Sequence, residues 1–182
     1  MVHSHRAHRE FKIRMKIRRA NLQDLNAIMN LIRSCTNYME ARGIHQWDEI
    51  YPDEKIINND IEKQQLYLLE DDEQICGIIA LNEFQEPQYQ SVDWKYRGKT
   101  LVVHRLSIEP SCQRKGYARM LMQFAHKLAK KEHYKSIRLD AFIHNPAAVA
   151  LYEKLGYRMA GKVTFRKGDF FCYEISVDSL KL

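Results

Sequence analysis

The chain has 182 residues, of which 45% are hydrophobic and 29% are charged, as in an ordinary soluble globular domain. No apolar run approaches the ~20 residues of a membrane-spanning helix, so we expect no membrane association and no secretory signal. The four cysteines are far apart and form no Cys-x-x-Cys pair, so we expect free thiols in a reducing cytoplasm and no metal site.

The formal net charge of +6 is unevenly distributed along the chain. Residues 1–19 hold seven Lys or Arg and one Glu, residues 40–93 hold fourteen Asp or Glu and three Lys or Arg, and residues 113–138 hold eight Lys or Arg and one Glu. Charge runs usually form solvated faces. The alternative is a pair of binding surfaces, a basic one for a polyanionic cofactor and an acidic one for a cationic second substrate.

Residues 1–12 are basic and have no apolar pattern, which predicts a disordered arm before a single domain at 13–182. The arm contains His3, His5 and His8. Their spacing matches no helical face and no cysteine accompanies them, so we expect no metal site there.

Hydrophobic periodicity predicts the elements of the N-terminal half. After a short strand at 13–18, Asn21 is the predicted N-cap of a helix that ends at Gly43, because apolar residues recur at helical spacing between them. A second helix is predicted at 53–63. The segments that follow are strands at 66–69 and 74–82 and a long polar loop at 83–99.

The most informative segment is a strand at 101–108 that leads into a basic, glycine-containing loop at 113–118, where a helix reaching about residue 131 begins. A helix N-terminus presents unpaired N–H groups and the positive end of its dipole. Full charges stand beside them on Arg114, Lys115 and Arg119. These features predict an anion site suited to a phosphate or pyrophosphate. The spacing matches neither a Walker loop nor the dinucleotide fingerprint.

The C-terminal part predicts a strand at 136–142 and then a helix that starts at Asn145-Pro146 and ends at Gly156. Two strands, at 157–161 and 170–177, complete the chain. The predicted order of elements is therefore β-α-α-β-β-β-α-β-α-β-β.

Two motifs in this framework resemble a known family. Gln113-x-x-Gly116-x-Ala118, after a strand that ends in Ile-Glu-Pro, resembles the acyl-CoA-binding loop of the GNAT superfamily of N-acetyltransferases. Asn145-x-x-Ala148-x-x-Leu151-Tyr152-x-Lys154-Leu155-Gly156-Tyr157 resembles its second signature. The resemblance covers residues 16–177. It implies an α/β fold with a mixed, mostly antiparallel sheet of about seven strands flanked by about four helices.

The resemblance also implies site residues and a reaction, the transfer of an acetyl group from acetyl-CoA to an amine. Tyr152 would be the general acid that protonates the departing CoA thiolate. A phenol with a pKa near ~10 is protonated at neutral pH, and Tyr152 shares a helical face with Asn145, two turns earlier. The implied cofactor-binding residues are Leu106, Ser107, Ile108, Gln113, Arg114, Lys115, Gly116, Tyr117, Ala118, Arg119 and Asn145. The rival interpretation of Tyr152 is a packed core tyrosine.

An attacking amine must lose a proton, and the sequence leaves the general base open. Some family members use a glutamate in the fourth strand, where this chain has Val102. By strict alternation His104 shares a strand face with Leu106 and Ile108. A histidine ordinarily titrates near neutrality, so His104 is one candidate base, and Glu83 is its rival.

Aromatic residues predict an acceptor site. Trp47, Tyr51 and Glu83 are the candidate substrate-binding residues, with Tyr89, Trp94 and Tyr96 in neighbouring segments, because an aromatic wall with carboxylates suits a cation. The acceptor amine itself is left open, as is a homodimer. Two other classes stay open: a catalytically silent acyl-CoA-binding regulator, and a basic nucleic-acid-binding module, for which no recognition motif is present. We expect no nucleic-acid partner.

Overall fold

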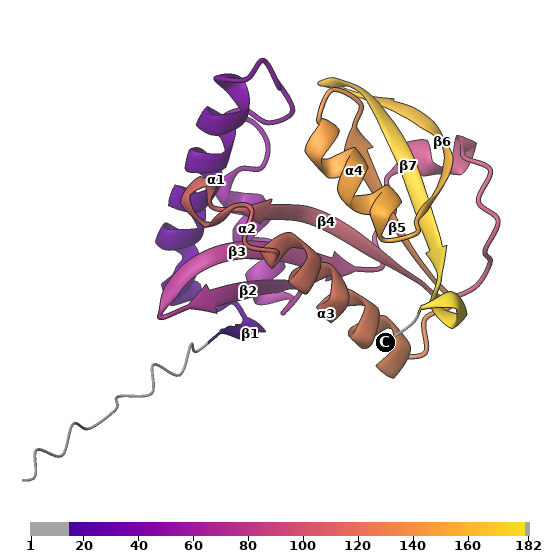
Figure 1. Cartoon of the computed structure of the whole chain (residues 1–182), viewed down its shortest axis with the longest axis horizontal. Coiled ribbons are helices and arrows are strands. Elements are labelled where there is room, and N and C mark those ends of the chain that lie inside the picture. The colour runs from indigo at the N-terminus through magenta and orange to yellow at the C-terminus, as the bar shows by residue number, and fades with distance from the viewer. Residues whose placement is uncertain (1–14, 181–182) are drawn as a thin grey trace, which may run out of the picture.

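The computed structural model describes residues 15–180, so the arm predicted at 1–12 and the beginning of the strand predicted at 13–18 lie outside the described residues. A seven-stranded sheet with the order β1-β2-β3-β4-β5-β7-β6 forms the centre (Figure 1). Every neighbouring pair is antiparallel except β4 and β5. The expected mixed α/β architecture is therefore confirmed.

The elements follow the predicted order. The strands are β1 (Lys16–Arg19), β2 (Leu66–Asp71), β3 (Gln74–Asn82), β4 (Thr100–Ile108), β5 (Ser136–Phe142), β6 (Arg158–Phe165) and β7 (Gly168–Ser176). The α-helices are α1 (Leu25–Glu40), α2 (Glu54–Glu62), α3 (Tyr117–Lys131) and α4 (Pro146–Lys154). The loop predicted at 83–99 contains a short 3-10 helix at Pro87–Ser91. No helix within residues 15–180 has both the length and the apolar character needed to span a bilayer.

Helices cover both faces of the sheet. Successive side chains of a strand point to opposite faces, and the apolar ones on each face are buried by helices. On one face, Leu66, Leu68 and Ile78 pack with α1 and α2. On the other, Leu69 and Ile79 pack with α3 and α4. The 83–99 segment extends the α1 and α2 face: its buried residues pack over the C-terminal half of the sheet, in a cluster with Tyr89, Val92, Trp94, Val102, Phe142 and Phe170.

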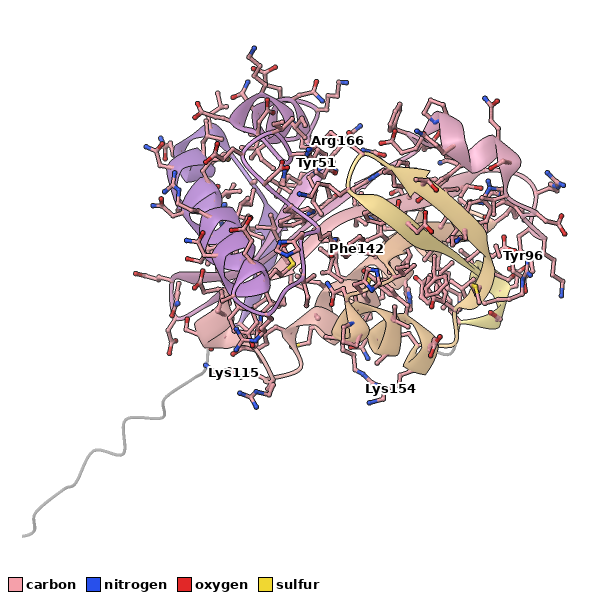
Figure 2. All side chains as sticks on the ribbon, turned by 90° about the horizontal axis from the view of Figure 1, so that it is seen from above. Tyr51, Tyr96, Lys115, Phe142, Lys154 and Arg166 are labelled. Atoms are coloured by element: carbon pink, nitrogen blue, oxygen red, sulfur yellow. The ribbon has the colours of Figure 1, made fainter. Side chains whose placement is uncertain are left out.

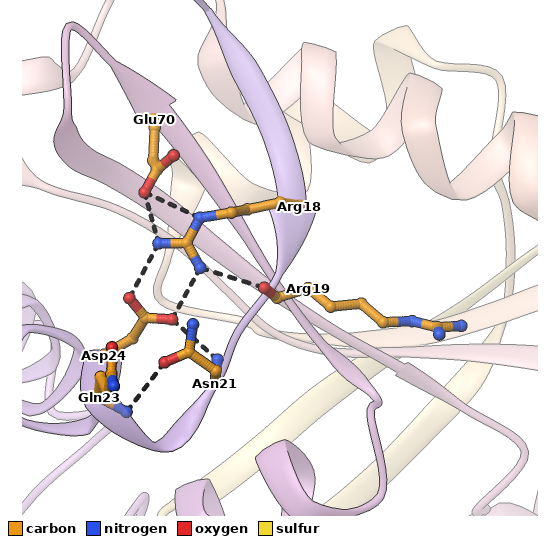
Figure 3. A network of polar contacts seen from close by, with 6 residues as sticks. All are labelled: Arg18, Arg19, Asn21, Gln23, Asp24 and Glu70. Carbon is orange, nitrogen blue, oxygen red and sulfur yellow. Dashed lines mark hydrogen bonds and ion pairs between the residues drawn. The ribbon is translucent and has the colours of Figure 1, made fainter.

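An ion-pair network fixes the N-terminal edge of the sheet (Figure 3). The Arg18 guanidinium donates to the Asp24 carboxylate at 2.7 and 2.8 Å, and its Nε donates to Glu70 at 3.0 Å. Asn21 begins a 3-10 turn, in which its Oδ1 accepts from the backbone N–H of Gln23 at 2.9 Å. The predicted cap therefore starts this turn, and α1 begins only at Leu25.

The two halves of the sheet separate between β4 and β5. Their parallel pairing joins only Thr100–Val102 to Ser136–Arg138. Figure 1 shows the two strands diverging from that shared end. Within residues 15–180, no strand pairs with the β5 side of β4 beyond Val102, so backbone groups on that edge can pair with a ligand.

A β-bulge in β4 changes which side chains face the gap. His104 is opposite Ala80 and Ser107 is opposite Ile78, so β4 carries one extra residue there. Arg105 adopts a left-handed φ of 52°. After the bulge, the next apolar side chains of β4, Leu106 and Ile108, pack with the α3 and α4 cluster, whereas Val102 packs on the opposite face. The expectation that His104 shares a face with Leu106 and Ile108 is therefore wrong.

Candidate active site

A cavity of about 490 Å³ lies where β4 and β5 separate. Residues from both faces of the sheet line it, because the gap between the strands connects the two sides. Tyr51 and Arg166, from the loop before α2 and the turn after β6, lie close together in Figure 2 and both line the cavity. The lining also includes Trp47, Glu86, His104, Arg105, Leu106, Asp140, Asn145, Tyr152 and Lys167.

The first turn of α4 positions one wall of the cavity. Asn145 caps the helix: its Oδ1 accepts from the Ala148 N–H at 3.2 Å, and Pro146 occupies the first helical turn. The Asn145 Nδ2 donates to Gln46 Oε1 at 3.0 Å. Two turns later, Tyr152 lines the same cavity. The helix therefore presents Asn145 and Tyr152 to one space, as their spacing predicts.

Tyr152 combines burial with an unused hydroxyl. The residue is 6% exposed, and its ring packs against Tyr157 and Tyr173 with centroids 6.0 Å apart in each case. Among residues 15–180, no hydrogen-bond partner of its hydroxyl is found. Burial raises its pKa, and the nearby Asp140 charge raises it further. The phenol is therefore protonated at neutral pH and can donate.

Two carboxyl groups in the cavity were not predicted from the sequence. Asp140 lies on β5, and its Oδ2 accepts a hydrogen bond from the buried Tyr89 hydroxyl at 2.7 Å. Burial raises the pKa of Asp140 to about 6; the Tyr89 bond opposes this and Glu86 adds to it. Burial also raises the pKa of Glu86, against the opposing effect of Arg105. For Asp140, the sequence did contain one signal: in β5 the polar residues Ser136, Arg138 and Asp140 alternate with apolar residues.

Arg105 is a buried cation at the bulge of β4. Its side chain is 9% exposed, and Nη2 lies 2.7 Å from Asp60 Oδ2. Its Nη1 donates to the Tyr51 hydroxyl at 3.0 Å. The Arg105 Nε is buried without a partner among the described residues. These contacts join β4 to α2 and to the loop that carries Tyr51.

The remaining cations of the cavity are also paired. The Arg166 guanidinium donates to Asp48 at 2.7 and 2.9 Å, and Lys167 Nζ donates to Asp48 at 3.2 Å. By contrast, Glu86 has no ion pair within residues 15–180. Asp140 accepts a hydrogen bond from the Tyr89 hydroxyl, which carries no charge. Arg166 and Lys167 share one carboxylate, so the two further negative charges of Glu86 and Asp140 leave this group of residues with a net charge of about one negative.

The two candidate bases from the sequence lie in different surroundings. His104 lines the cavity, but its Nε2 faces two acceptors, Asn82 Oδ1 at 3.0 Å and the Phe84 carbonyl at 3.2 Å. Burial lowers the pKa of His104 to about 4. Glu83 does not line the cavity; its carboxylate accepts from the Tyr134 hydroxyl at 2.9 Å and is largely exposed. This position gives no support to a role for Glu83 as base or as substrate-binding residue.

The predicted anion loop lies beyond the end of β4 and outside the cavity. Gly116 has a φ of 83°, with open space where a Cβ would stand, and α3 begins at the next residue. No backbone carbonyl within residues 15–180 accepts from the N–H groups of Arg114, Lys115 or Gly116. Gln113 ties the loop to the strand, because its Nε2 donates to the Ile108 carbonyl at 3.3 Å. Such a loop can hold a pyrophosphate with backbone N–H groups.

Some of the predicted aromatic residues line the cavity, whereas others are buried in the core. The Tyr117 side chain is buried, and its hydroxyl donates to Asp71 at 2.5 Å, so this residue could contact a ligand only through its backbone. Trp47 and Tyr51 line the cavity. Tyr89 and Trp94 are buried behind it, where Trp94 Nε1 donates to the Tyr89 carbonyl at 2.8 Å.

The model of the acetyltransferase (GNAT) family matches residues 25–157 of the chain. The chain belongs to the GNAT family. Solved structures share its fold. One is a GNAT acetyltransferase of Streptococcus agalactiae, with a TM-score of 0.79 and 24% identity over 89% of this chain and 95% of that chain.

Two similar structures contain the cofactor. The PaiA N-acetyltransferase of Thermoplasma acidophilum, solved with coenzyme A, has a TM-score of 0.72 and 19% identity over 90% of this chain and 99% of that one. YncA of Salmonella typhimurium, solved with acetyl-CoA, has a TM-score of 0.67 and 17% identity over 93% and 97%. Membership of the acetyltransferase (GNAT) family gives acetyl transfer as the general activity of this chain. Within residues 15–180 no group of three or more His, Cys, Asp or Glu is arranged to hold a metal ion.

Proposed function

We propose that this GNAT protein transfers an acetyl group from acetyl-CoA directly to a primary amine, with Tyr152 as the general acid. The observation that supports this most is that Tyr152 lines the cavity, where its hydroxyl has no hydrogen-bond partner among the described residues. A hydroxyl that opens into the cavity can donate its proton to a ligand bound there.

In this proposal acetyl-CoA lies along the free edge of β4 and ends in the cavity. The pantetheine arm pairs with backbone groups of Leu106, Ser107 and Ile108, where β4 has left β5. Asn145 lies near the same arm. The N–H groups of Arg114, Lys115, Gly116, Tyr117 and Ala118 hold the pyrophosphate, with Arg119 close by, whereas the Gln113 N–H donates to the Pro110 carbonyl at 3.3 Å. The basic segment 113–138 favours this polyanion.

The chemistry follows from the position of Tyr152. When the amine attacks the thioester carbonyl and the C–S bond breaks, the sulfur leaves as a thiolate. A protonated phenol supplies the proton that turns it into the thiol. Trp47 and Tyr51 border the acceptor, and Tyr51 joins that wall to Arg105.

Thiol release from acetyl-CoA, measured against an amine panel, tests this function. The panel holds a polyamine, an amino sugar, free amino acids and peptides with a free N-terminus or lysine, beside a control without amine. We expect amine-dependent release with one acetyl group gained by the acceptor in its mass spectrum. Tight acetyl-CoA binding without release on any amine would contradict the proposal and favour a silent CoA-binding regulator. Salt-dependent DNA binding that CoA does not displace would favour a nucleic-acid module.

A further inference from the structure

The cavity has an uncompensated negative charge on one side of the β4–β5 gap. Glu86 comes from the loop after β3 and Asp140 from β5, and both line the cavity. The three cations there pair with two carboxylates, Arg105 with Asp60 and both Arg166 and Lys167 with Asp48, so the ionised Glu86 and Asp140 leave a net charge of one negative. A ligand group that completes the charge balance of this cavity is therefore a cation.

The two carboxyl groups are held in place by their surroundings. The Tyr89 hydroxyl is the hydrogen-bond donor to Asp140, and Tyr89 itself is 2% exposed. Asp140 and Tyr152 line the same cavity, and the charge of Asp140 raises the pKa of the Tyr152 phenol. The buried phenol without a partner and the carboxyl groups therefore face one common space, in which a reacting thioester and an amine can meet.

We propose that Asp140 and Glu86 form the acceptor subsite: they bind the ammonium group of a cationic amine, and Asp140 takes one of its protons. This inference rests on the proposed acetyl transfer. The substrate class that it names is an aliphatic amine that is charged in solution, as opposed to an aromatic or other weakly basic amine that arrives neutral.

Two residues move protons in the proposed reaction, Asp140 at the amine and Tyr152 at the sulfur. The Asp140 carboxylate accepts one proton from the ammonium group and later releases it to solvent. The neutral nitrogen forms a bond to the acetyl carbon, and the C–S bond breaks. Tyr152 gives its proton to the sulfur and recovers a proton from the nitrogen of the new amide. The products are the acetamide, the CoA thiol and one released proton.

Several groups set the pH range in which Asp140 can act. Its own pKa of about 6 leaves it mostly ionised at neutral pH and still basic. The titratable or charged groups that face it from the surrounding elements are Glu86, Tyr89, Tyr51, His104, Arg105, Tyr152 and Cys172. Of these, the Tyr89 bond lowers the pKa of Asp140 and the Glu86 charge raises it.

Asp140→Asn, compared with Asp178→Asn on the exposed surface, tests the proposal with two kinds of nucleophile. With a cationic alkylamine, we expect kcat/KM of Asp140→Asn to fall about 100-fold, the usual contribution of a positioned base. With an aminooxy compound, which is neutral at the assay pH, we expect a change below about fivefold, because no proton needs to be removed first. Equal losses with both nucleophiles, or no loss with either, overturn the assignment.

Two milder variants keep the test informative if Asp140→Asn does not fold. Tyr89→Phe removes the bond that lowers the pKa of Asp140, so the low-pH limb of kcat/KM moves to higher pH. Glu86→Gln removes the charge that raises it, so the limb moves to lower pH. A purely structural role of these residues leaves the limb in place, and that result overturns the proposal. If the wild type releases no thiol with any nucleophile, the proposed acetyl transfer itself fails.

Discussion

The Tyr89 hydroxyl donates a hydrogen bond of 2.7 Å to Asp140, and this bond joins the 83–99 segment to β5 beside the cavity. Trp94 supports Tyr89 from behind through its Nε1 bond to the Tyr89 carbonyl. The long polar segment is thus a wall of the candidate site, and its buried aromatic residues fix the position of a carboxyl group.

Asp140→Asn should stabilise the protein at neutral pH. Burial raises the pKa of Asp140 from 3.8 to about 6, so the folded state favours the protonated form. A raised pKa contributes stability that is fully present below pH 3.8 and is lost as the pH rises through about 6. At pH 7.5 the ionised carboxylate therefore costs up to about 3 kcal/mol, which asparagine does not incur.

Urea denaturation of the wild type and Asp140→Asn at several pH values checks this expectation. The gain in unfolding free energy should be largest at neutral pH and should shrink as the pH approaches 4. An effect of the same size at all pH values would mean that the carboxyl group is not held in an unfavourable charged state.

His104→Ala should retain the low-pH limb of kcat/KM near pH 6. Both acceptors beside Nε2 require that nitrogen to carry the proton, and the pKa of His104 is lowered to about 4. A titration near 6 thus belongs to Asp140. The measurement is the pH dependence of thiol release, with acetyl-CoA affinity as control. Loss of the limb in His104→Ala would instead identify His104 as the base.

Gly116→Ala should weaken acetyl-CoA binding by conformational strain. The φ of 83° at Gly116 is left-handed, and nothing lies within 4 Å of an added Cβ, so the strain is confined to the backbone. We expect a loss of about 1 kcal/mol in stability and a several-fold higher KM for acetyl-CoA, because the loop N–H groups lose their arrangement.

Gly43→Ala is the matched control for that variant. Gly43 has a φ of 73° with the same open surroundings, but it follows α1, far along the chain from the predicted anion loop. It should lose a similar amount of stability with an unchanged KM. If both variants raise KM equally, the loop at Gly116 has no special part in cofactor binding.

The sequence predicted the fold closely because its signals are local. The bounds of α3 and β5 follow from periodicity, and Asn145 caps α4 as its neighbour Pro146 indicates. The β4 bulge has no such signal, because the left-handed residue is Arg105 rather than a glycine. Strict alternation therefore put His104 on the wrong face relative to Leu106.

The acidic part of the cavity could not be predicted for a different reason. Asp140 and Tyr89 are 51 residues apart, and a nonlocal hydrogen bond leaves no periodic pattern. The same holds for the partners that neutralise Arg105 and Arg166, which come from α2 and from the loop before it. The motif at 145–157, by contrast, is continuous in the sequence. It therefore indicated Tyr152, which lines the cavity beside the gap.

The most direct test of the account is the turnover of Tyr152→Phe, measured as thiol release with an accepted amine and compared with Tyr38→Phe on α1. Phenylalanine keeps the packing against Tyr157 and Tyr173 and removes only the hydroxyl. We predict that kcat of Tyr152→Phe falls about 100-fold, as expected for the loss of a general acid, with acetyl-CoA affinity unchanged. Turnover equal to that of the wild type would contradict the assignment of this cavity as the site of acetyl transfer through Tyr152.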